Sequence, residues 1–234
     1  MSKLEKQINN ATLAWDSKSI KEQTYVTKFS SKSQEYLNLF IDKFSKSELV
    51  SFTSDSSISP SFVSEVKDIK ANFLDNGPGF VIIDSFVENA SSNSIGVKNA
   101  LLYVSSLLGT PIQQNATGLM VKEVKDRSLS YSDDTTSRYS DNKHGGNYHT
   151  DGAEIPPPIP EYLPLLCIRP AKKGGAFKLI NSHTIHNKLL DEKPEVLDRL
   201  YQDFYWDRRG DLGPNGEEVF TKPIFTYVNN KLTF

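Results

Sequence analysis

The amino-acid sequence predicts an α+β fold in which a jelly roll or a β-sandwich is flanked by helices. Two observations lead to this prediction. The second half of the chain is rich in short strand-like runs with one helical excursion, whereas the first half mixes helical and strand-like segments. A purely parallel α/β sheet would need strands and helices in regular alternation, and the order of these segments does not provide it.

Apolar residues at helical spacing predict the helices. The predicted ranges are about 34–44, 60–75, 94–108, 182–190 and 194–202. Ser33 and Ser182 are the expected N-caps of the first and fourth helices. Ser59-Pro60 combines a capping residue with proline at the first helical position. Gly109 is expected to end the third helix.

Compact apolar runs bounded by turn residues predict the strands. The predicted ranges are about 79–84, 118–124, 163–168, 176–181 and 204–206. A hairpin is expected at the C-terminal end, where the runs 219–228 and 231–234 flank Asn229-Asn230.

Length and composition favour a single domain of a cytoplasmic protein. The chain has 234 residues, enough for one sizeable core, and we expect residues 1–32 to form an N-terminal arm and residues 33–234 one domain. A net charge of -2 argues against a nucleic-acid partner. No apolar run approaches the ~20 residues of a membrane span, and the polar N-terminus lacks a secretion signal. The single cysteine, Cys167, fits a reducing compartment and is expected to be buried.

The stretch that carries chemistry is Asn147-Tyr148-His149-Thr150-Asp151-Gly152. Residues two apart on an extended backbone point to the same side, so His149 and Asp151 can reach one metal ion. An imidazole and a carboxylate are two thirds of the 2-His-1-carboxylate triad that holds non-haem Fe(II). A His-x-Asp arises by chance in roughly one such chain in four, so the residues around it must decide whether it is a metal site.

Polar residues around this motif are the candidate substrate-binding groups. Asn147 lies on the ligand side, His144 precedes the motif and Glu154, which can bind a substrate ammonium, follows it. The alternatives are that Asn147 closes the preceding turn and that His144 and Glu154 are solvated loop side chains. The long polar segment 125–143 leads into the motif and is expected to be a lid or a substrate loop.

The surroundings of the motif resemble the taurine dioxygenase (TauD/TfdA-like) family of Fe(II)/2-oxoglutarate oxygenases. The shared pattern is a His-Thr-Asp, a proline-containing loop, an apolar strand, Gly-Gly, a second strand and a helix. These parts are His149-Thr150-Asp151, Pro156 to Pro160, Leu165 to Ile168, Gly174-Gly175, Leu179 to Ser182, and His186 to Leu189. The upstream strand and Leu108-Gly109-Thr110-Pro111 also match, so the resemblance covers about residues 77–234.

The resemblance implies a cupin-like, double-stranded β-helix (jelly roll) with metal and cosubstrate inside its open end. His149 and Asp151 would be the iron ligands, with Fe(II), 2-oxoglutarate as cosubstrate and O2. The implied reaction is hydroxylation of an unactivated C–H of a small polar metabolite, such as an amino acid or a derivative. Desaturation or another oxidative rearrangement at the same centre is an alternative. A carboxylate at Asp151 disfavours halogenation, because related halogenases carry a small residue there.

Three departures from the family pattern bear on these expectations. The family places its third ligand, a histidine, and a 2-oxoglutarate-binding arginine downstream of a strand like 231–234, where this sequence stops. We therefore expect the domain to be incomplete at its C-terminus; otherwise the chain would be a non-catalytic β-helix binding protein. Phe177 stands two residues after Gly-Gly, where the family commonly has a threonine that hydrogen-bonds the cosubstrate, and phenylalanine cannot make this bond. The arginines of Arg208-Arg209 are either solvated, or one of them binds an anionic group or buttresses the barrel. His183 and His186 are expected to have structural or surface roles.

Overall fold

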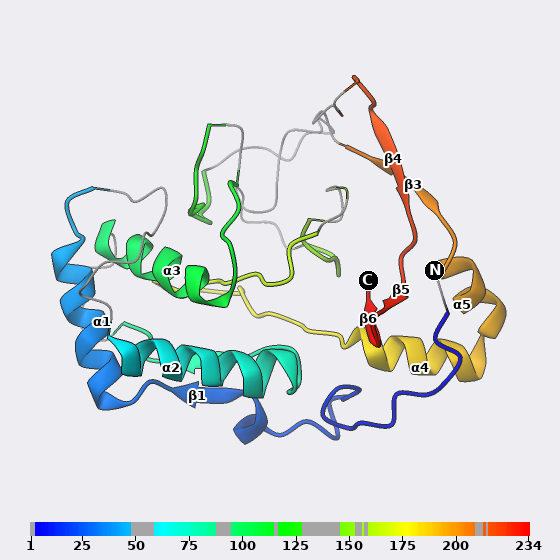
Figure 1. The fold of residues 1–234 in the computed structure, drawn as a ribbon, viewed down its shortest axis with the longest axis horizontal. Helices are drawn as coiled ribbons and strands as arrows, with labels where there is room; N and C mark the ends of the chain where they lie inside the picture. The colour runs from blue at the N-terminus through cyan, green and yellow to red at the C-terminus, as the bar shows by residue number, and fades with distance from the viewer. Residues whose placement is uncertain are drawn as a thin grey trace.

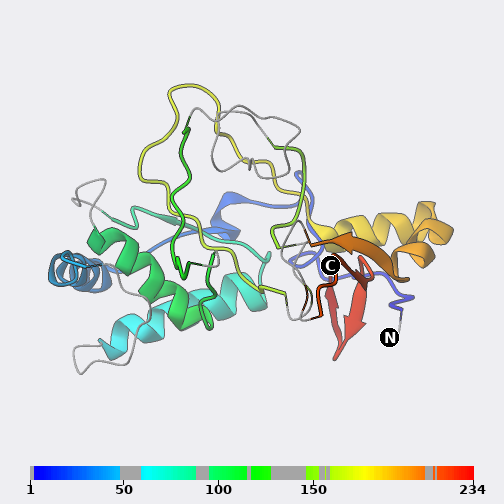
Figure 2. The same ribbon diagram turned by 90° about the horizontal axis from the view of Figure 1, so that it is seen from above.

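The computed structural model describes residues 3–47, 59–87, 95–114, 117–127, 146–152, 156, 159–208, 213 and 215–234. Its helices and strands form two groups. An N-terminal helical group, blue to green in Figure 1, occupies one end of the molecule, and a C-terminal group, yellow to red, occupies the other. Figure 2 shows the same two groups side by side from above, with long loops between them.

The N-terminal group is built on three helices. They are α1 (Ser31–Lys43), α2 (Pro60–Ile69), which continues into the π-helical turn η2 (Lys70–Asp75), and α3 (Ile95–Leu108). The Ser59 hydroxyl accepts the Phe62 N–H, so the predicted Ser59-Pro60 start of α2 is confirmed. The predicted cap Ser33 is wrong, because the Ser30 hydroxyl accepts the Ser33 N–H and starts α1 one turn earlier.

Aromatic side chains fill the core between these helices. The Tyr103 ring stacks on Phe40 at 4.8 Å and on Phe62 at 5.7 Å between centroids, and all three side chains are buried. Burial of each such ring contributes about 1.5 to 3 kcal/mol. The predicted apolar stripes of α1 and α2 are confirmed, since Leu37 and Val66 join the same core.

A short parallel sheet lies beside the helices. After the 3-10 turn η1 (Glu22–Thr24), β1 (Val26–Lys28) pairs with β2 (Ile82–Asp84), with Val26 opposite Ile82. The segment predicted as an N-terminal arm therefore contributes a strand. Lys28 and Asp84, opposite each other at the end of this sheet, form an ion pair of 2.8 Å.

The C-terminal group combines two helices with two antiparallel ladders. Its elements are α4 (Ser182–Glu192), α5 (Pro194–Leu200), β3 (Phe204–Asp207) paired with β4 (Val219–Lys222), and β5 (Thr226–Val228) paired with β6 (Lys231–Thr233). The predicted hairpin turn is confirmed between β5 and β6: Asn229 and Asn230 both have positive φ, as a tight type I′ turn requires. The predicted run 219–228 is divided, and its first part, β4, pairs with β3 instead. Asn181, not Ser182, caps α4.

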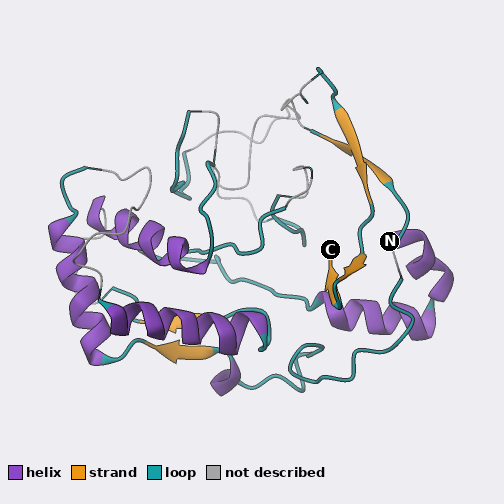
Figure 3. Cartoon of the chain, in the orientation of Figure 1, coloured by secondary structure: helices purple, strands orange, loops and turns teal. Residues whose placement is uncertain are grey.

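Three predicted strands do not form. The described residues from 109 to 181, which include 118–124, 163–168 and 176–181, contain neither helix nor strand (Figure 3). Several of their apolar side chains are exposed, with Phe177 78% and Leu165 58% accessible, and Cys167 is exposed rather than buried. A strand needs a neighbour for its backbone hydrogen bonds, and no described strand lies alongside these segments.

The observed architecture is thus a mixture of helices with three two-stranded sheets among the described residues, and a jelly roll is not formed by them. The part of the chain that the structure describes includes no helix with the length and apolar character that a membrane span requires.

Candidate metal site

The His149 and Asp151 side chains converge, although the motif is a loop and not a strand. The chain bends at Tyr148 and turns at Asp151-Gly152, where Gly152 has a φ of 74°. This path brings His149 Nε2 to 3.6 Å from Asp151 Oδ1, with both side chains about half exposed. The two side chains therefore lie close together, and each is about half exposed.

A hydrogen bond to the main chain fixes the His149 ring. His149 Nδ1 lies 2.6 Å from the Asn147 carbonyl oxygen. A carbonyl can only accept, so Nδ1 carries the proton, and in the neutral ring Nε2 carries the lone pair. Metal-binding histidines are commonly held in this way, with one ring N–H on a backbone carbonyl and the other nitrogen on the ion.

The spacing of the two donor atoms fits a shared divalent ion. Donors that each lie about 2.1 Å from one ion are separated by about 3 to 3.6 Å when they subtend about 90 to 120° at it. The 3.6 Å between His149 Nε2 and Asp151 Oδ1 falls within this range. Within the described ranges, no group of three or more His, Cys, Asp or Glu side chains is placed to hold a metal. His149 and Asp151 are thus the part of the candidate metal site that lies within the described residues.

The other sequence-predicted residues are less fully placed. Asn147 is exposed and reaches His149 through its main chain. Tyr148, which follows Asn147 at the bend, is 63% exposed. His144, Glu154 and most of the predicted lid lie outside the described residues.

A polar network that the sequence did not predict anchors the chain after the motif. The Tyr162 hydroxyl and the Lys70 ammonium both donate to Asp75, the last residue of η2; Lys70 does so at 2.7 Å and also lies over the Tyr162 ring. The hydrogen bonds from Lys70 and Tyr162 lower the pKa of Asp75, and that from Asp75 raises the pKa of Lys70. A separation of 87 residues between Asp75 and Tyr162 leaves no local signal by which to find the contact.

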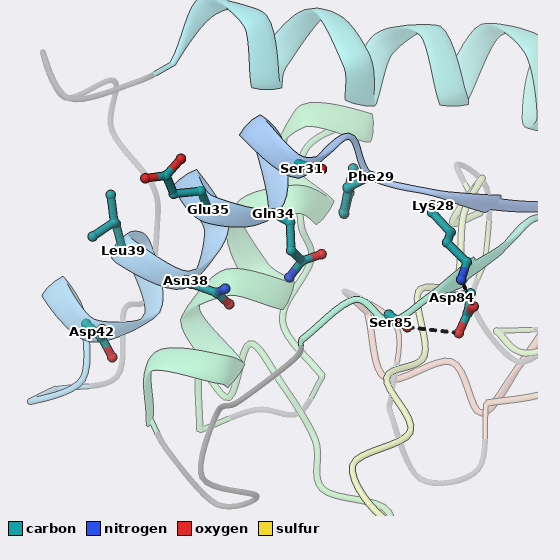
Figure 4. A pocket seen from close by; sticks show the side chains of 10 residues that line it. All are labelled: Lys28, Phe29, Ser31, Gln34, Glu35, Asn38, Leu39, Asp42, Asp84 and Ser85. Atoms are coloured by element: carbon teal, nitrogen blue, oxygen red, sulfur yellow. Dashed lines mark hydrogen bonds and ion pairs between the residues drawn. The ribbon is translucent and has the colours of Figure 1, made fainter.

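A groove of about 500 Å³ lies on the helical group, apart from the motif (Figure 4). One face of α1 forms one wall, from Ser31 to Asp42, and Lys28, Asp84 and Ser85 at the sheet end form the other. None of its lining residues belongs to the motif or to the predicted substrate contacts.

Comparison with known proteins identifies the family. The family model described as taurine catabolism dioxygenase TauD, TfdA family, matches residues 93–229, more than half of the chain and including the motif. The chain belongs to the TauD/TfdA family. Members of this family are Fe(II)/2-oxoglutarate dioxygenases with a cupin-like β-helix. Family membership thus confirms the resemblance on which the metal-site hypothesis depends.

Two relatives show how much of a protein this similarity covers. FR-33289 synthase of Streptomyces rubellomurinus is 31% identical over 126 residues, which are 54% of this chain and 35% of that protein. Taurine hydroxylase-like protein SAT17 of Stachybotrys chartarum is 35% identical over 85 residues, which are 36% of this chain and 19% of that protein. The chain thus matches about a third or less of the length of each relative.

Proposed function

We propose that this protein is an Fe(II)/2-oxoglutarate-dependent dioxygenase that hydroxylates an unactivated C–H of a small polar metabolite, an amino acid or a derivative. One observation carries the proposal. The His149 and Asp151 donor atoms lie 3.6 Å apart, with the histidine tautomer fixed by Asn147, inside the region that the TauD family model matches.

Each residue of the pair has a distinct role in this proposal. His149 Nε2 would be a neutral ligand, oriented before the metal arrives, and Asp151 would supply an anionic oxygen. When bound, Fe(II) and 2-oxoglutarate supply the oxidising chemistry that couples O2 to decarboxylation of the cosubstrate. Both side chains are about half exposed, as a site that takes up small molecules requires. We propose the family's double-stranded β-helix as the fold around this site.

The substrate class rests on the polarity of the segments around the motif. Asn147, His144 and Glu154 supply hydrogen-bonding and charged groups suited to an amino or carboxyl group of a metabolite. The net charge of -2 and the single cysteine support a cytoplasmic enzyme with a small-molecule partner.

The test is an anaerobic titration with Fe(II) and 2-oxoglutarate, followed by a turnover assay. We expect the weak visible charge-transfer band of a bound iron-cosubstrate complex, and succinate on admission of air with an accepted substrate. Asp151→Ala should abolish the band and turnover, since it removes the anionic ligand. Asp191→Ala, at an exposed carboxylate on α4, is the matched control and should keep both. An unchanged band in Asp151→Ala, or no band and no succinate in the unmutated protein, would contradict the proposal.

A further inference from the structure

The first residues of the chain lie along α4 and are held there by its side chains. We call residues 3–15 the strap; it is the dark-blue segment beside α4 in Figure 1. Asn187 binds both main-chain groups of Ile8: its Oδ1 accepts the Ile8 N–H at 2.8 Å and its Nδ2 donates to the Ile8 carbonyl at 3.0 Å. One turn earlier Thr184 donates to the Trp15 carbonyl at 2.7 Å. The strap is therefore recognised through its backbone.

A buried histidine lies beneath the strap. His186 is fully buried, with its ring edge-on to Phe225 at 5.5 Å and to Tyr201 at 5.9 Å. Its Nε2 lies 3.0 Å from the Tyr201 hydroxyl, and the same hydroxyl oxygen accepts the Leu4 N–H of the strap at 3.3 Å. A single hydroxyl thus joins the histidine to the strap.

The surroundings of His186 accept the neutral ring and disfavour the cation. Among the described residues, Nδ1 is buried without a hydrogen-bond partner. A neutral ring can leave its lone pair at Nδ1, whereas the imidazolium would have an N–H there with no acceptor, which is costly in a buried site. If His186 were protonated while the strap stayed docked, an unsatisfied charged donor would therefore be buried.

The charged groups around His186 add to this effect. The nearby basic residues are Lys3 on the strap and His183 on α4. Lys3 forms an ion pair with Asp198 on α5. The other titratable neighbours are Tyr201, whose pKa burial raises, and Tyr227 on β5, which interacts with it. Burial, and secondarily the charges of His183 and Lys3, lowers the pKa of His186.

We propose that His186 is a pH-sensitive latch, which holds the strap on α4 when neutral and releases it when protonated. Release would take the Leu4 N–H away from the Tyr201 hydroxyl that lies on His186 Nε2, and water would then reach this hydroxyl. The docked state has the lower pKa, so docking is strongest above the ordinary histidine value of 6.5 and weakens as the pH falls below it. With one histidine responsible, the docking equilibrium should fall about tenfold between pH 7.5 and pH 5.5.

Amide hydrogen exchange of the full chain tests the latch, because the Leu4 and Ile8 N–H groups both report docking. Protection of these amides, corrected for the intrinsic exchange rate, should fall about tenfold over that pH range, while protection of α3 amides stays constant. In His186→Phe, which keeps a ring but cannot titrate, the strap amides should lose this pH dependence; His186→Gln serves the same purpose if the phenylalanine variant does not fold. His183→Gln is the comparison variant: it removes a secondary contribution to the lowered pKa of His186 and should retain most of the pH dependence, because burial is the main cause.

Three results would overturn the latch. One is constant protection of Leu4 and Ile8 from pH 7.5 to pH 5.5 in the unmutated protein. Another is a pH dependence that survives in the His186 variants or disappears in His183→Gln. The third is an equal loss of protection in α3, which would mean unfolding of the whole protein.

Discussion

At the residue scale, the Asn147 carbonyl oxygen decides which nitrogen of His149 faces Asp151. The bond is made by the main chain, over a separation of two residues, so the bend of the loop and not the asparagine side chain creates it. The asparagine side chain is therefore available for another role, such as the substrate contact considered from the sequence.

Asn147→Ala separates these two roles. We expect the affinity for Co(II), used as an air-stable substitute for Fe(II), to change by less than about twofold, because the carbonyl acceptor remains. His149→Ala should remove binding, since it deletes a ligand. Isothermal titration calorimetry measures both. A loss of tenfold or more in Asn147→Ala would show that its side chain orients the ligand pair.

The spacing of His149 and Asp151 predicted that their side chains lie close together, but on an extended backbone, whereas a bend and a turn of a loop bring them together. Spacing did not predict the outward position of Tyr148 or Cys167, because exposure depends on what the rest of the fold places over a side chain. The contact of Tyr162 with Asp75 was beyond prediction for the same reason: only the folded chain brings η2 to this residue.

At the element scale, α1 and α3 approach each other closely at one glycine. Gly96 is buried in the first turn of α3, and a Cβ built on it would overlap the Ile41 carbonyl oxygen of α1. The two nearest obstacles, the carbonyl oxygen and the carbonyl carbon of Ile41, are both backbone atoms, so a change of rotamer cannot relieve the overlap. The absence of a side chain at Gly96 therefore sets the distance between these helices.

Gly96→Ala should destabilise the protein by about 1 to 3 kcal/mol, the usual range for overpacking a core. Gly109→Ala is the matched control: a Cβ there meets nothing within 4 Å and its φ is not left-handed, so it should be close to neutral. Urea unfolding gives both free energies. Equal values for the two variants would argue against a close helix contact.

A second prediction concerns the anchor between η2 and Tyr162. Tyr162→Phe removes a hydrogen bond to the ionised Asp75 and should cost about 1 kcal/mol at pH 7. The pKa of Asp75 is lowered, so the contribution of this carboxylate is present above its ordinary value of 3.8 and is lost as the pH falls below it. The difference between Tyr162→Phe and the unmutated protein should therefore shrink in acid.

Unfolding by urea at several pH values measures this difference. Tyr205→Phe is the control, because the Tyr205 side chain is 84% exposed and its hydroxyl should contribute little. A pH-independent difference would show that the hydroxyl does not act through the carboxylate.

The helix start at Ser59-Pro60 was predictable, and the absence of strands at 118–124, 163–168 and 176–181 was not, for a physical reason. Ser59-Pro60 is a signal that acts within one turn, and the structure confirms it. An apolar run such as 163–168 indicates a strand only if another strand lies beside it, and nothing in its own residues specifies that neighbour. The hairpin at Asn229-Asn230 was predictable because its two strands are joined by their own turn.

At the scale of the whole molecule, the two cores are separate and the strap connects them. One core lies between α1, α2 and α3, and the other contains Leu197, Phe225 and Leu232. Trp15 contacts both groups. Its indole N–H donates to the Pro78 carbonyl at 2.7 Å and its ring packs on Phe80 at 5.3 Å, while its own carbonyl accepts from Thr184 on α4.

Trp15→Ala should therefore weaken the coupling between the two cores. We expect a loss of about 2 kcal/mol, below the 3 to 5 kcal/mol of a fully buried aromatic side chain, because Trp15 is only partly buried. With less coupling, the C-terminal group should unfold at a lower urea concentration than the helical group, so the transition is no longer two-state.

Trp15→Phe is the matched reference, since both variants leave Trp206 as the sole tryptophan and the phenylalanine keeps a ring against Phe80. Trp206 donates to the Lys222 carbonyl across the β3–β4 ladder, so its fluorescence reports the C-terminal group. Amide signals of α3 report the helical group. The two midpoints should coincide in Trp15→Phe and separate in Trp15→Ala. Coincident midpoints in both would mean that contacts other than the Trp15 ring couple the two cores.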